Sequence, residues 1–356
     1  MRLTWFKDGG VSGRVILAGD IGGTNTNLAV AVERGGSIEL IMEAVFESAA
    51  VTDFTDCVLR TVEAARTRLP QLNIELCCVS GAGPVKDNYC QLTNQNWAID
   101  GSAVQKALGV PTLVINDFTA ISYGLPLLNV TDEKQIAVLR RPDGSSPKPA
   151  GEMRAVFGAG TGLGVGFLTK NAGRWLAFPS EGGHMDFADF DDDSRAFKSW
   201  LTAKIGFVPE YELAISGMGI RSLFHFYVER GDIVKTDPAA ASILALPEPD
   251  QPAAVSKAAA DHAGCAKVLA TFVRMYARLA ASIACFLLPR AGIYLAGGIS
   301  GKNLDAFTED DRFVRTFERH CNPNLLKVLK EIPLYIIKDY SISLYGAANA
   351  ALSLMV

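Results

Sequence analysis

The sequence predicts an α/β fold built from a duplicated unit and divided into two domains. Strand-like apolar runs alternate with helix-like stretches almost from end to end, which is typical of layered α/β proteins. The chain has 356 residues, too many for one ordinary hydrophobic core. The second half also repeats the theme of the first half: a strand, a glycine-rich turn and a helix. In such folds we expect ligands in the cleft between the two halves.

The first half is predicted to begin with a group of strands. The β-branched runs at 15–18 and 28–32 indicate two strands, and residues 37–46 continue the pattern. Residues 52–69 have helical spacing, with their apolar side chains on one face. The remaining predicted elements of this half are a strand at 76–79, a helix at 101–108 and a strand at 112–115.

The second half is predicted to begin after an exposed loop at 140–149, which is rich in proline, glycine and serine. Its predicted elements are a strand at 154–157, helices at 194–204, 219–230 and 253–286, a strand at 292–295 and a final helix at 343–354. We assign residues 1–118 to a small domain that a C-terminal helix at about 340–356 completes. Residues 119–339 then form a large domain.

Composition limits the class of protein. Hydrophobic residues make up 49% and charged residues 20%, as in well-packed globular enzymes. The net charge of −4 with mixed signs predicts no nucleic-acid partner and no anionic-lipid surface. The seven cysteines lack metal-binding spacing, so we expect reduced thiols in a cytoplasmic protein. No apolar run approaches the roughly 20 residues of a membrane span, and the closest is 280–288.

The first glycine-rich turn follows a buried strand. Glycine lets backbone N–H groups approach a phosphate closely, but Gly-Gly also marks simple hairpin turns. An acid two residues before the glycines and small polar residues after them favour phosphate binding, with the acid holding Mg²⁺ through water. The residues concerned are Asp20, Gly22, Gly23, Thr24 and Asn25. Neither this turn nor a second one at 158–164 has the spacing of a Walker loop or of a dinucleotide fingerprint.

Two polar clusters are candidates for chemistry. Asn116 and Asp117 end an apolar strand, where ligands of open α/β sheets bind, and Asp117 could take a proton from a hydroxyl. An Asp117 N-cap of the following helix is an equally good interpretation. Glu181 and His184 stand three residues apart across two glycines, so both can point into one pocket. No other His or Cys lies near them in sequence, and we expect no zinc site.

Other polar residues are ambiguous alone. Asn94 precedes Trp97, and amides beside an indole suit a sugar, but an anchoring tryptophan in a polar loop is the simpler interpretation. Glu212 is similarly ambiguous. The acidic run 189–193 is expected to be solvated and to start a helix, and we assign no role to the isolated His225, His262 and His320.

Taken in order, these pieces resemble the bacterial-type glucokinase family of the hexokinase/actin-like ATPase superfamily, from about Leu17 to about Ala350. Residues 20–25 resemble its first phosphate motif, 158–164 its second and 296–299 its adenosine motif. The most specific match is the ordered trio 94–97, 116–118 and 181–187. The resemblance implies a two-domain actin-like ATPase (ribonuclease H-like) fold, with mixed sheets flanked by helices and a cleft between the domains.

The resemblance also implies an activity: ATP-dependent phosphorylation of the 6-hydroxyl of D-glucose, feeding glycolysis, with Asp117 as general base. It implies glucose contacts for Asn94, Asn116, Asp117, Glu181, His184 and Glu212. It implies ATP contacts for Asp20, Gly22, Gly23, Thr24, Asn25, Gly160, Thr161, Gly162, Gly297 and Gly298, with Mg²⁺ held at Asp20.

Several alternatives stay open at this point. Another hexose, or a non-catalytic sugar-sensing role, fits the same motifs. Glycine turns do not separate ATP from ADP or polyphosphate as the donor. The family resemblance is also compatible with a homodimer. Residues 1–14 and 129–152 carry no family signal and are expected to be a variable terminus and a surface loop.

Overall fold

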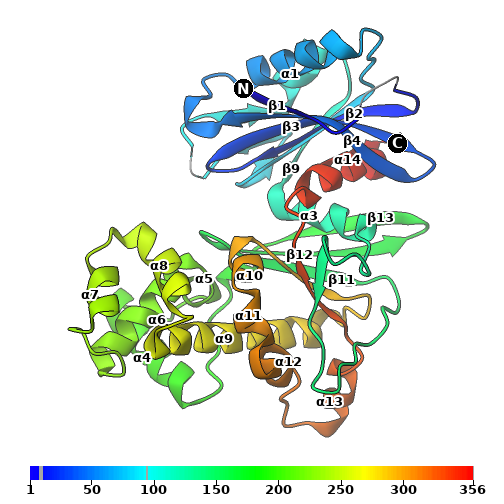
Figure 1. Ribbon diagram of the computed structural model, residues 1–356. Coiled ribbons are helices and arrows are strands. Elements are labelled where there is room, and N and C mark those ends of the chain that lie inside the picture. Colours follow the sequence, from blue (N-terminus) through cyan, green and yellow to red (C-terminus); the bar gives the residue numbers. More distant parts are fainter. Residues whose placement is uncertain (8–10, 94, 356) are drawn as a thin grey trace. The chain divides into compact units, whose positions relative to one another are not determined.

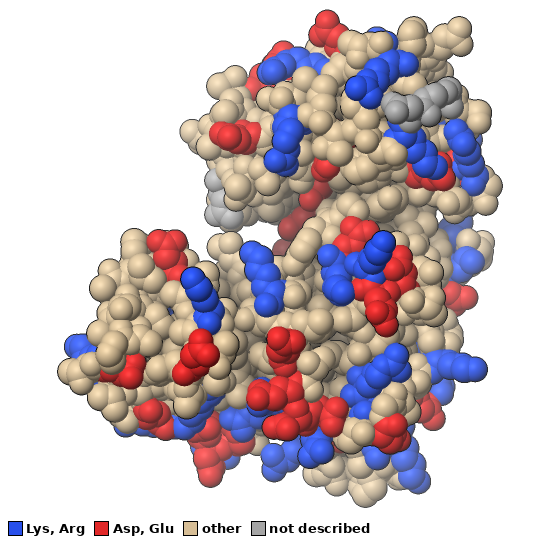
Figure 2. Space-filling model, in the orientation of Figure 1, with Lys and Arg blue, Asp and Glu red and all other residues tan. Residues whose placement is uncertain are grey.

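The computed structural model describes residues 1–7, 11–93 and 95–355, and the chain forms two compact units. Unit 1 comprises Met1–Asn129, Gly166–Pro179 and Asp339–Val356, and unit 2 comprises Val130–Val165 and Ser180–Lys338. Each unit contains a mixed sheet flanked by helices, as the sequence predicts (Figure 1). On the face shown in Figure 2, acidic and basic side chains alternate over each unit.

The sheet of unit 1 has six strands in the order β1-β4-β3-β2-β5-β9. β2 lies antiparallel to β3 and parallel to β5, and β5 lies parallel to β9. Their bounds are β1 (Arg2–Trp5), β2 (Arg14–Ile21), β3 (Asn25–Arg34), β4 (Ser37–Glu47), β5 (Leu76–Gly81) and β9 (Thr112–Asn116). β1 pairs with β4, so part of the segment expected to be a variable terminus is an edge strand.

Helices cover both faces of this sheet, because both sets of alternating side chains on its central strand are apolar. Leu17 of β2 packs in the cluster beneath α1 (Phe54–Arg68), whereas Ile16 and Ala18 pack in the cluster beneath α14 (Ile342–Met355). Figure 1 shows α1 and α14 on opposite faces. The unit also contains η1 (Ser48–Ala50), α2 (Gly101–Leu108), α3 (Asp117–Gly124), η2 (Leu125–Leu127) and a small sheet of β6 (Val85–Lys86), β7 (Tyr89–Gln91) and β8 (Ala98–Asp100).

The boundary of unit 1 differs from the one that we predicted, because residues 119–129 and 166–179 pack with it. The backbones of α3 and α14 touch: a Cβ on Gly346 would lie 1.8 Å from the Ala120 carbonyl oxygen. The Asn349 side chain also donates a hydrogen bond to the Tyr123 carbonyl, at 2.7 Å. Leu168 joins the apolar cluster beneath α14. Contacts between residues so distant in sequence leave no local pattern from which this boundary could be predicted.

The second sheet, which includes β12 and β13, mostly from residues 166–179 of unit 1, as well as strands of unit 2, repeats the plan of the first sheet, with the order β10-β15-β14-β11-β12-β13. Strand β11 has the next strands in sequence, β12 and β13, on one side and the later parallel strands β14 and β15 on the other, as β2 has β3 and β4 on one side and β5 and β9 on the other. The bounds are β10 (Ile136–Val138), β11 (Arg154–Ala159), β12 (Leu163–Asn171), β13 (Arg174–Ser180), β14 (Ile293–Ala296) and β15 (Leu334–Ile337). This shared plan supports the predicted duplication.

Helix α9 (Ala263–Leu287) forms the centre of unit 2 and packs against α6 (Gly217–Arg230) and α12 (Arg312–Phe317). By length and composition α9 could cross a membrane, so our prediction that no segment approaches a span is wrong. Arg274 and Arg278 interrupt its apolar run, so the lengths of continuous apolar runs did not reveal the high mean hydropathy of the whole helix. Because 72% of its most apolar window is buried, α9 is typical of a core helix.

The remaining helices of unit 2 are mostly short. They are η3 (Gly182–His184), α4 (Asp192–Ile205), α5 (Tyr211–Ala214), α7 (Pro238–Leu244), η4 (Glu248–Asp250), α8 (Gln251–Ala258), α10 (Gly298–Lys302), α11 (Leu304–Thr308), η5 (Glu309–Asp311) and α13 (Pro323–Leu329). The single helix predicted at 253–286 is wrong, because α8 and α9 are separate. His262 ends the connection and caps α9 by accepting the Cys265 N–H on Nδ1 at 3.0 Å.

Two sequence predictions about side chains are confirmed. All seven cysteines are free thiols, five of them buried. The acidic run starts α4, where Asp191 and Ser194 form a reciprocal capping box.

The contact of α3 with α14 predicts the effect of one added methyl group. Gly346→Ala must push the two helices apart, which we expect to destabilise unit 1 by about 1–3 kcal/mol. Thermal unfolding followed by calorimetry measures the effect. Leu354→Ala, at an exposed position of the same helix, is the matched control. An unchanged unfolding temperature for Gly346→Ala would contradict the close helix contact.

Candidate active site

The first group of predicted site residues lies where three parallel strands of unit 1 end. Asp20 of β2 is level with Ser80 of β5, and Gly81 of β5 is level with Asn116 of β9. Because parallel strands end at the same edge of a sheet, Asp20, Asn116 and Asp117 come together there. This edge is where open α/β sheets bind their ligands.

Asp20 is a partly buried carboxylate with hydroxyl neighbours. The Ser80 hydroxyl lies 3.4 Å from Oδ1 of Asp20, and the side chains of Ser343 and Asn27 also donate to the carboxylate. Burial raises the pKa of Asp20, while these three hydrogen bonds lower it. Ser343 lies at the start of α14, so the C-terminal helix contributes to the surroundings of this acid.

The residue that caps α3 is Asn116, so the interpretation of Asp117 as the cap is wrong. Oδ1 of Asn116 accepts the backbone N–H groups of Phe118 at 2.9 Å and Thr119 at 3.3 Å. Asparagine in extended backbone conformation is a good cap, and it takes this role one residue earlier than predicted. Asp117 is therefore the first residue of the helix, and its Oδ1 accepts the Phe118 N–H at 2.9 Å.

The surroundings of Asp117 favour its neutral form. Burial is the main cause and raises the pKa of this carboxyl to about 6, and the charge of Asp20 adds to the rise. The hydrogen bonds from the Phe118 N–H and from Asn116 oppose it. A carboxylate with a pKa near 6 is ionised at neutral pH and basic enough to accept a proton from a bound hydroxyl.

The first glycine turn is the hairpin connection of β2 to β3, the alternative that the sequence left open. Gly22 donates its N–H to the Asn25 carbonyl at 2.9 Å, and its own carbonyl accepts the Ser48 hydroxyl at 2.8 Å. The N–H of Gly22 is thus already in use. Gly23, Thr24 and Asn25 are exposed, so this hairpin presents polar groups to solvent.

The tryptophan near this turn has a structural role. The Trp97 indole N–H donates to the Ser48 carbonyl at 3.0 Å, and its ring stacks on Phe54. The interpretation as an anchoring tryptophan therefore holds. Asn94, the predicted sugar ligand beside it, lies outside the described residues.

The second and third glycine turns lie side by side in unit 2, at the ends of the parallel strands β11 and β14. Gly297 has φ +85°, and a Cβ there would lie 2.6 Å from the Ala159 carbonyl oxygen. Glycine is therefore required where β14 turns into α10, which begins at Gly298. In the second turn the Gly160 N–H donates to the Gly162 carbonyl at 2.8 Å, while Thr161 is exposed.

Glu212 connects the second glycine turn to the other predicted sugar ligands. Its Oε2 accepts the Leu163 N–H at 2.7 Å, and a Cβ on Gly162 would lie 2.4 Å from the same oxygen. Gly162 therefore leaves room for the carboxylate of Glu212. One oxygen of Glu212 serves the turn, and the other is available to a ligand.

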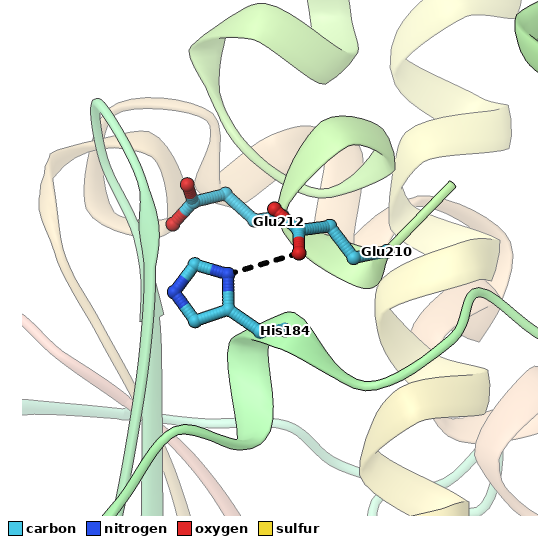
Figure 3. Close-up of side chains that lie close together, drawn as sticks. All are labelled: His184, Glu210 and Glu212. Atoms are coloured by element: carbon cyan, nitrogen blue, oxygen red, sulfur yellow. Dashed lines mark ion pairs between the residues drawn. The ribbon is translucent and has the colours of Figure 1, made fainter. Parts of the chain in front are cut away.

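His184 lies among three carboxylates of unit 2. Its Nδ1 is 3.1 Å from Oε2 of Glu210, and its Nε2 is 3.7 Å from Oε2 of Glu181. Figure 3 shows the ring beside the carboxylates of Glu210 and Glu212. The hydrogen bond to Glu210 is the main cause that raises the pKa of His184, and the charges of the three glutamates add to it. The structure thus brings together Glu181, His184 and Glu212, as predicted.

Glu210 belongs to none of the sequence motifs and was not predicted as a site residue. Ligand atoms of His184, Glu210 and Glu212 lie within 4.8 Å of one another, a spacing that a divalent ion could bridge. The hydrogen bond between His184 and Glu210 already accounts for that approach, and exposed acidic groups often gather without an ion. We assign no metal there. The other histidines have structural partners: His225 bonds Gln251, His262 caps α9 and His320 accepts the Asn322 N–H.

Comparison with known proteins identifies the family. The family model described as Glucokinase matches residues 17–354, and the glucokinase of Nostoc punctiforme is 34% identical over 352 residues, covering 95% of this chain and 98% of the relative. The chain belongs to the glucokinase family.

Solved structures of glucokinases share the fold. A glucokinase from an Antarctic psychrotroph superposes with a TM-score of 0.80 at 24% identity, over 96% of this chain and 99% of that one. A ROK family glucokinase from Streptomyces griseus, solved with glucose and AMPPNP, superposes with a TM-score of 0.59 at 19% identity, over 95% and 99%. The actin-like ATPase fold implied by the sequence is therefore confirmed.

The raised pKa of Asp117 predicts a stability difference. As pH rises from about 4 to about 6, Asp117 ionises in the unfolded chain before it ionises in the folded chain, so the free energy of unfolding falls. Asp117→Asn removes this loss and should stabilise the protein at neutral pH by up to about 3 kcal/mol. Urea unfolding at pH 4 and pH 7.5 measures it. A gain that is equal at both pH values would contradict the assigned burial of charge.

Proposed function

We propose that this chain is an ATP:D-glucose 6-phosphotransferase, which transfers the γ-phosphoryl group of ATP to the 6-hydroxyl of glucose and releases glucose 6-phosphate and ADP. The partly buried Asp117 at the strand end of unit 1 carries the proposal, because its pKa of about 6 suits a general base at neutral pH. Membership of the glucokinase family over residues 17–354 supports glucose as the acceptor.

In the proposed reaction, an oxygen of the Asp117 carboxylate takes the proton of the 6-hydroxyl. The sugar oxygen forms a bond to the γ-phosphorus while the bond from that phosphorus to the bridging oxygen breaks, and the electron pair leaves with ADP. Such transfers depend on positioning and charge neutralisation more than on covalent help from the protein. The two hydrogen bonds that Oδ1 of Asn116 accepts from the backbone N–H groups of Phe118 and Thr119 fix the backbone that carries Asp117.

Polar side chains of unit 2 would recognise the sugar hydroxyls. The carboxylates of Glu181 and Glu212 would accept hydrogen bonds from sugar hydroxyls, and His184 would offer Nε2. A ligand that lacks one of these hydroxyls would leave a polar group without a partner, which costs binding free energy. The Asn116 side chain already accepts two backbone N–H groups as a cap and donates to the Gly83 carbonyl at 3.4 Å, so a sugar contact through its amide would have to replace that long hydrogen bond.

The exposed parts of the glycine turns would bind the nucleotide. The N–H groups of Gly22 and Gly160 already donate hydrogen bonds within their own turns. We therefore assign the phosphate contacts to exposed residues of the same turns: Gly23, Thr24 and Asn25 in unit 1 and Thr161 in unit 2. Gly297 and Gly298 would border the adenosine. AMPPNP bound to the fold relative from Streptomyces griseus supports ATP as the donor.

The surroundings of Asp20 fit a magnesium ion. Its carboxylate and the hydroxyls of Ser80 and Ser343 are hard oxygen donors, and the repulsion between Asp20 and Asp117 would fall if a cation were present. Asp20 would hold the ion through water, and the bound ion would neutralise charge on the phosphates.

A coupled assay with MgATP and a panel of hexoses tests the proposal. We expect glucose to be the best acceptor, and Asp117→Ala to lower kcat by about 10²–10⁴ because the general base is lost. Glu63→Gln, an exposed carboxylate change on α1, is the control and should leave kcat unchanged. Robust hexose phosphorylation by Asp117→Ala, or the absence of activity in the unaltered chain, would overturn the proposal.

A further inference from the structure

We propose that Glu210 is a positioning residue, which holds the His184 imidazole with Nδ1 turned inward and Nε2 presented to a sugar hydroxyl. The inference rests on the proposed function, since it concerns the same sugar site. It adds a residue that the motifs do not include, and it assigns to Glu210 a role in orientation and charge rather than direct contact with substrate.

The backbone fixes Glu210 beside the segment that carries His184. Asp186 and Glu210 form an isolated antiparallel bridge. On one side of it Phe187 donates its N–H to the Pro209 carbonyl at 2.8 Å, and on the other Tyr211 donates to the Met185 carbonyl at 2.9 Å. Two segments separated by more than 20 residues in sequence therefore stay in register at this point.

Two aromatic side chains anchor this bridge. Phe187 is fully buried and Tyr211 nearly so, and their rings meet edge to face with centroids 5.6 Å apart. Such a pair is stabilising beyond the area that it buries. Because both rings sit next to the bridge in sequence, a shift of Glu210 relative to His184 would have to disturb the core of unit 2.

The side chains then determine which nitrogen faces a ligand. Nδ1 of His184 is 3.1 Å from Oε2 of Glu210, and an ionised carboxylate only accepts hydrogen bonds, so Nδ1 must carry a proton. Nε2 is 3.7 Å from Oε2 of Glu181, beyond hydrogen-bond distance. The imidazole is about half exposed, so Nε2 can meet a sugar hydroxyl.

The charged groups that face the ring are all acidic: Glu181 before η3, Glu210 before α5 and Glu212 within α5. Together they favour the protonated ring, with the hydrogen bond to Glu210 as the largest cause. Protonated His184 would donate to a hydroxyl from Nε2, whereas the neutral ring would accept from it. Glu210 thus influences both the direction of the ring and the sense of its hydrogen bond.

Two substitutions separate orientation from charge. Glu210→Gln keeps an acceptor for the Nδ1 proton but removes the charge, whereas Glu210→Ala removes both. We expect Glu210→Ala to raise the KM for glucose about tenfold while kcat changes less than threefold, because sugar binding suffers and the general base does not. At pH 8 the KM for glucose of Glu210→Gln should equal that of the unaltered chain, because the glutamine oxygen still accepts a hydrogen bond from Nδ1. Glu229→Gln, an exposed carboxylate change in the same unit, is the control.

A second measurement does not require activity. The chain contains only four histidines, so a ¹H–¹⁵N spectrum compared with that of His184→Asn assigns the His184 ring. We expect the proton on Nδ1 when the ring is neutral, and a lower titration midpoint in Glu210→Gln.

The outcomes distinguish this inference from the proposed function. A neutral ring protonated on Nε2, a midpoint unchanged in Glu210→Gln, or a KM unchanged in Glu210→Ala would overturn the role of Glu210 alone. If the unaltered chain phosphorylates no hexose, the proposed function fails, while the spectra still decide whether Glu210 orients His184.

Discussion

The proposed chemistry of this protein depends on one carboxylate that is partly shielded from water. Asp117 stands at the start of α3, directly after β9, and burial beside Asp20 raises its pKa to about 6. Retaining an acid in such a place costs stability at neutral pH, and the surrounding structure offsets the cost. Asn116 caps the helix, and α14 closes tightly on α3 through Gly346. The C-terminal helix is therefore part of what positions the proposed base.

Glycine occurs in the three turns for different physical reasons. Gly162 leaves room for the carboxylate of Glu212, and Gly297 combines a positive φ with close contact to Ala159. These two positions would demand glycine even without a nucleotide. A Cβ on Gly160, by contrast, would meet nothing within 4 Å. Within sequences that resemble phosphate loops, some glycines are therefore required by internal packing, whereas others face open space.

Local patterns predicted most of the fold and part of the site. Apolar periodicity located seven strands (β2, β3, β4, β5, β9, β11 and β14) and the bounds of helix 101–108, but it missed β1, β10, β12, β13 and β15 of the two large sheets. The polar residues at strand ends indicated Asp20 and Asp117 as candidates. Two failures arise from contacts distant in sequence: the boundary of unit 1 depends on packing against α14, and Glu210 reaches His184 through a bridge between residues 185–187 and 209–211. The break before α9 is local, because His262 caps the helix three residues before Cys265, and apolar periodicity does not detect a cap. A lone glutamate before a short helix offers no signal for that role.

The pH dependence of kcat/KM for glucose, measured with saturating MgATP, tests the central claim most directly. We expect an acid limb that falls tenfold per pH unit and belongs to Asp117, with an apparent pKa above the usual aspartate value but no higher than about 6, because bound magnesium would lessen the repulsion from Asp20. The limb should stay in place in Glu210→Gln, since that change acts on His184 and not on Asp117. A profile that remains flat down to pH 4.5, or a limb that moves with Glu210→Gln, would contradict Asp117 as the base.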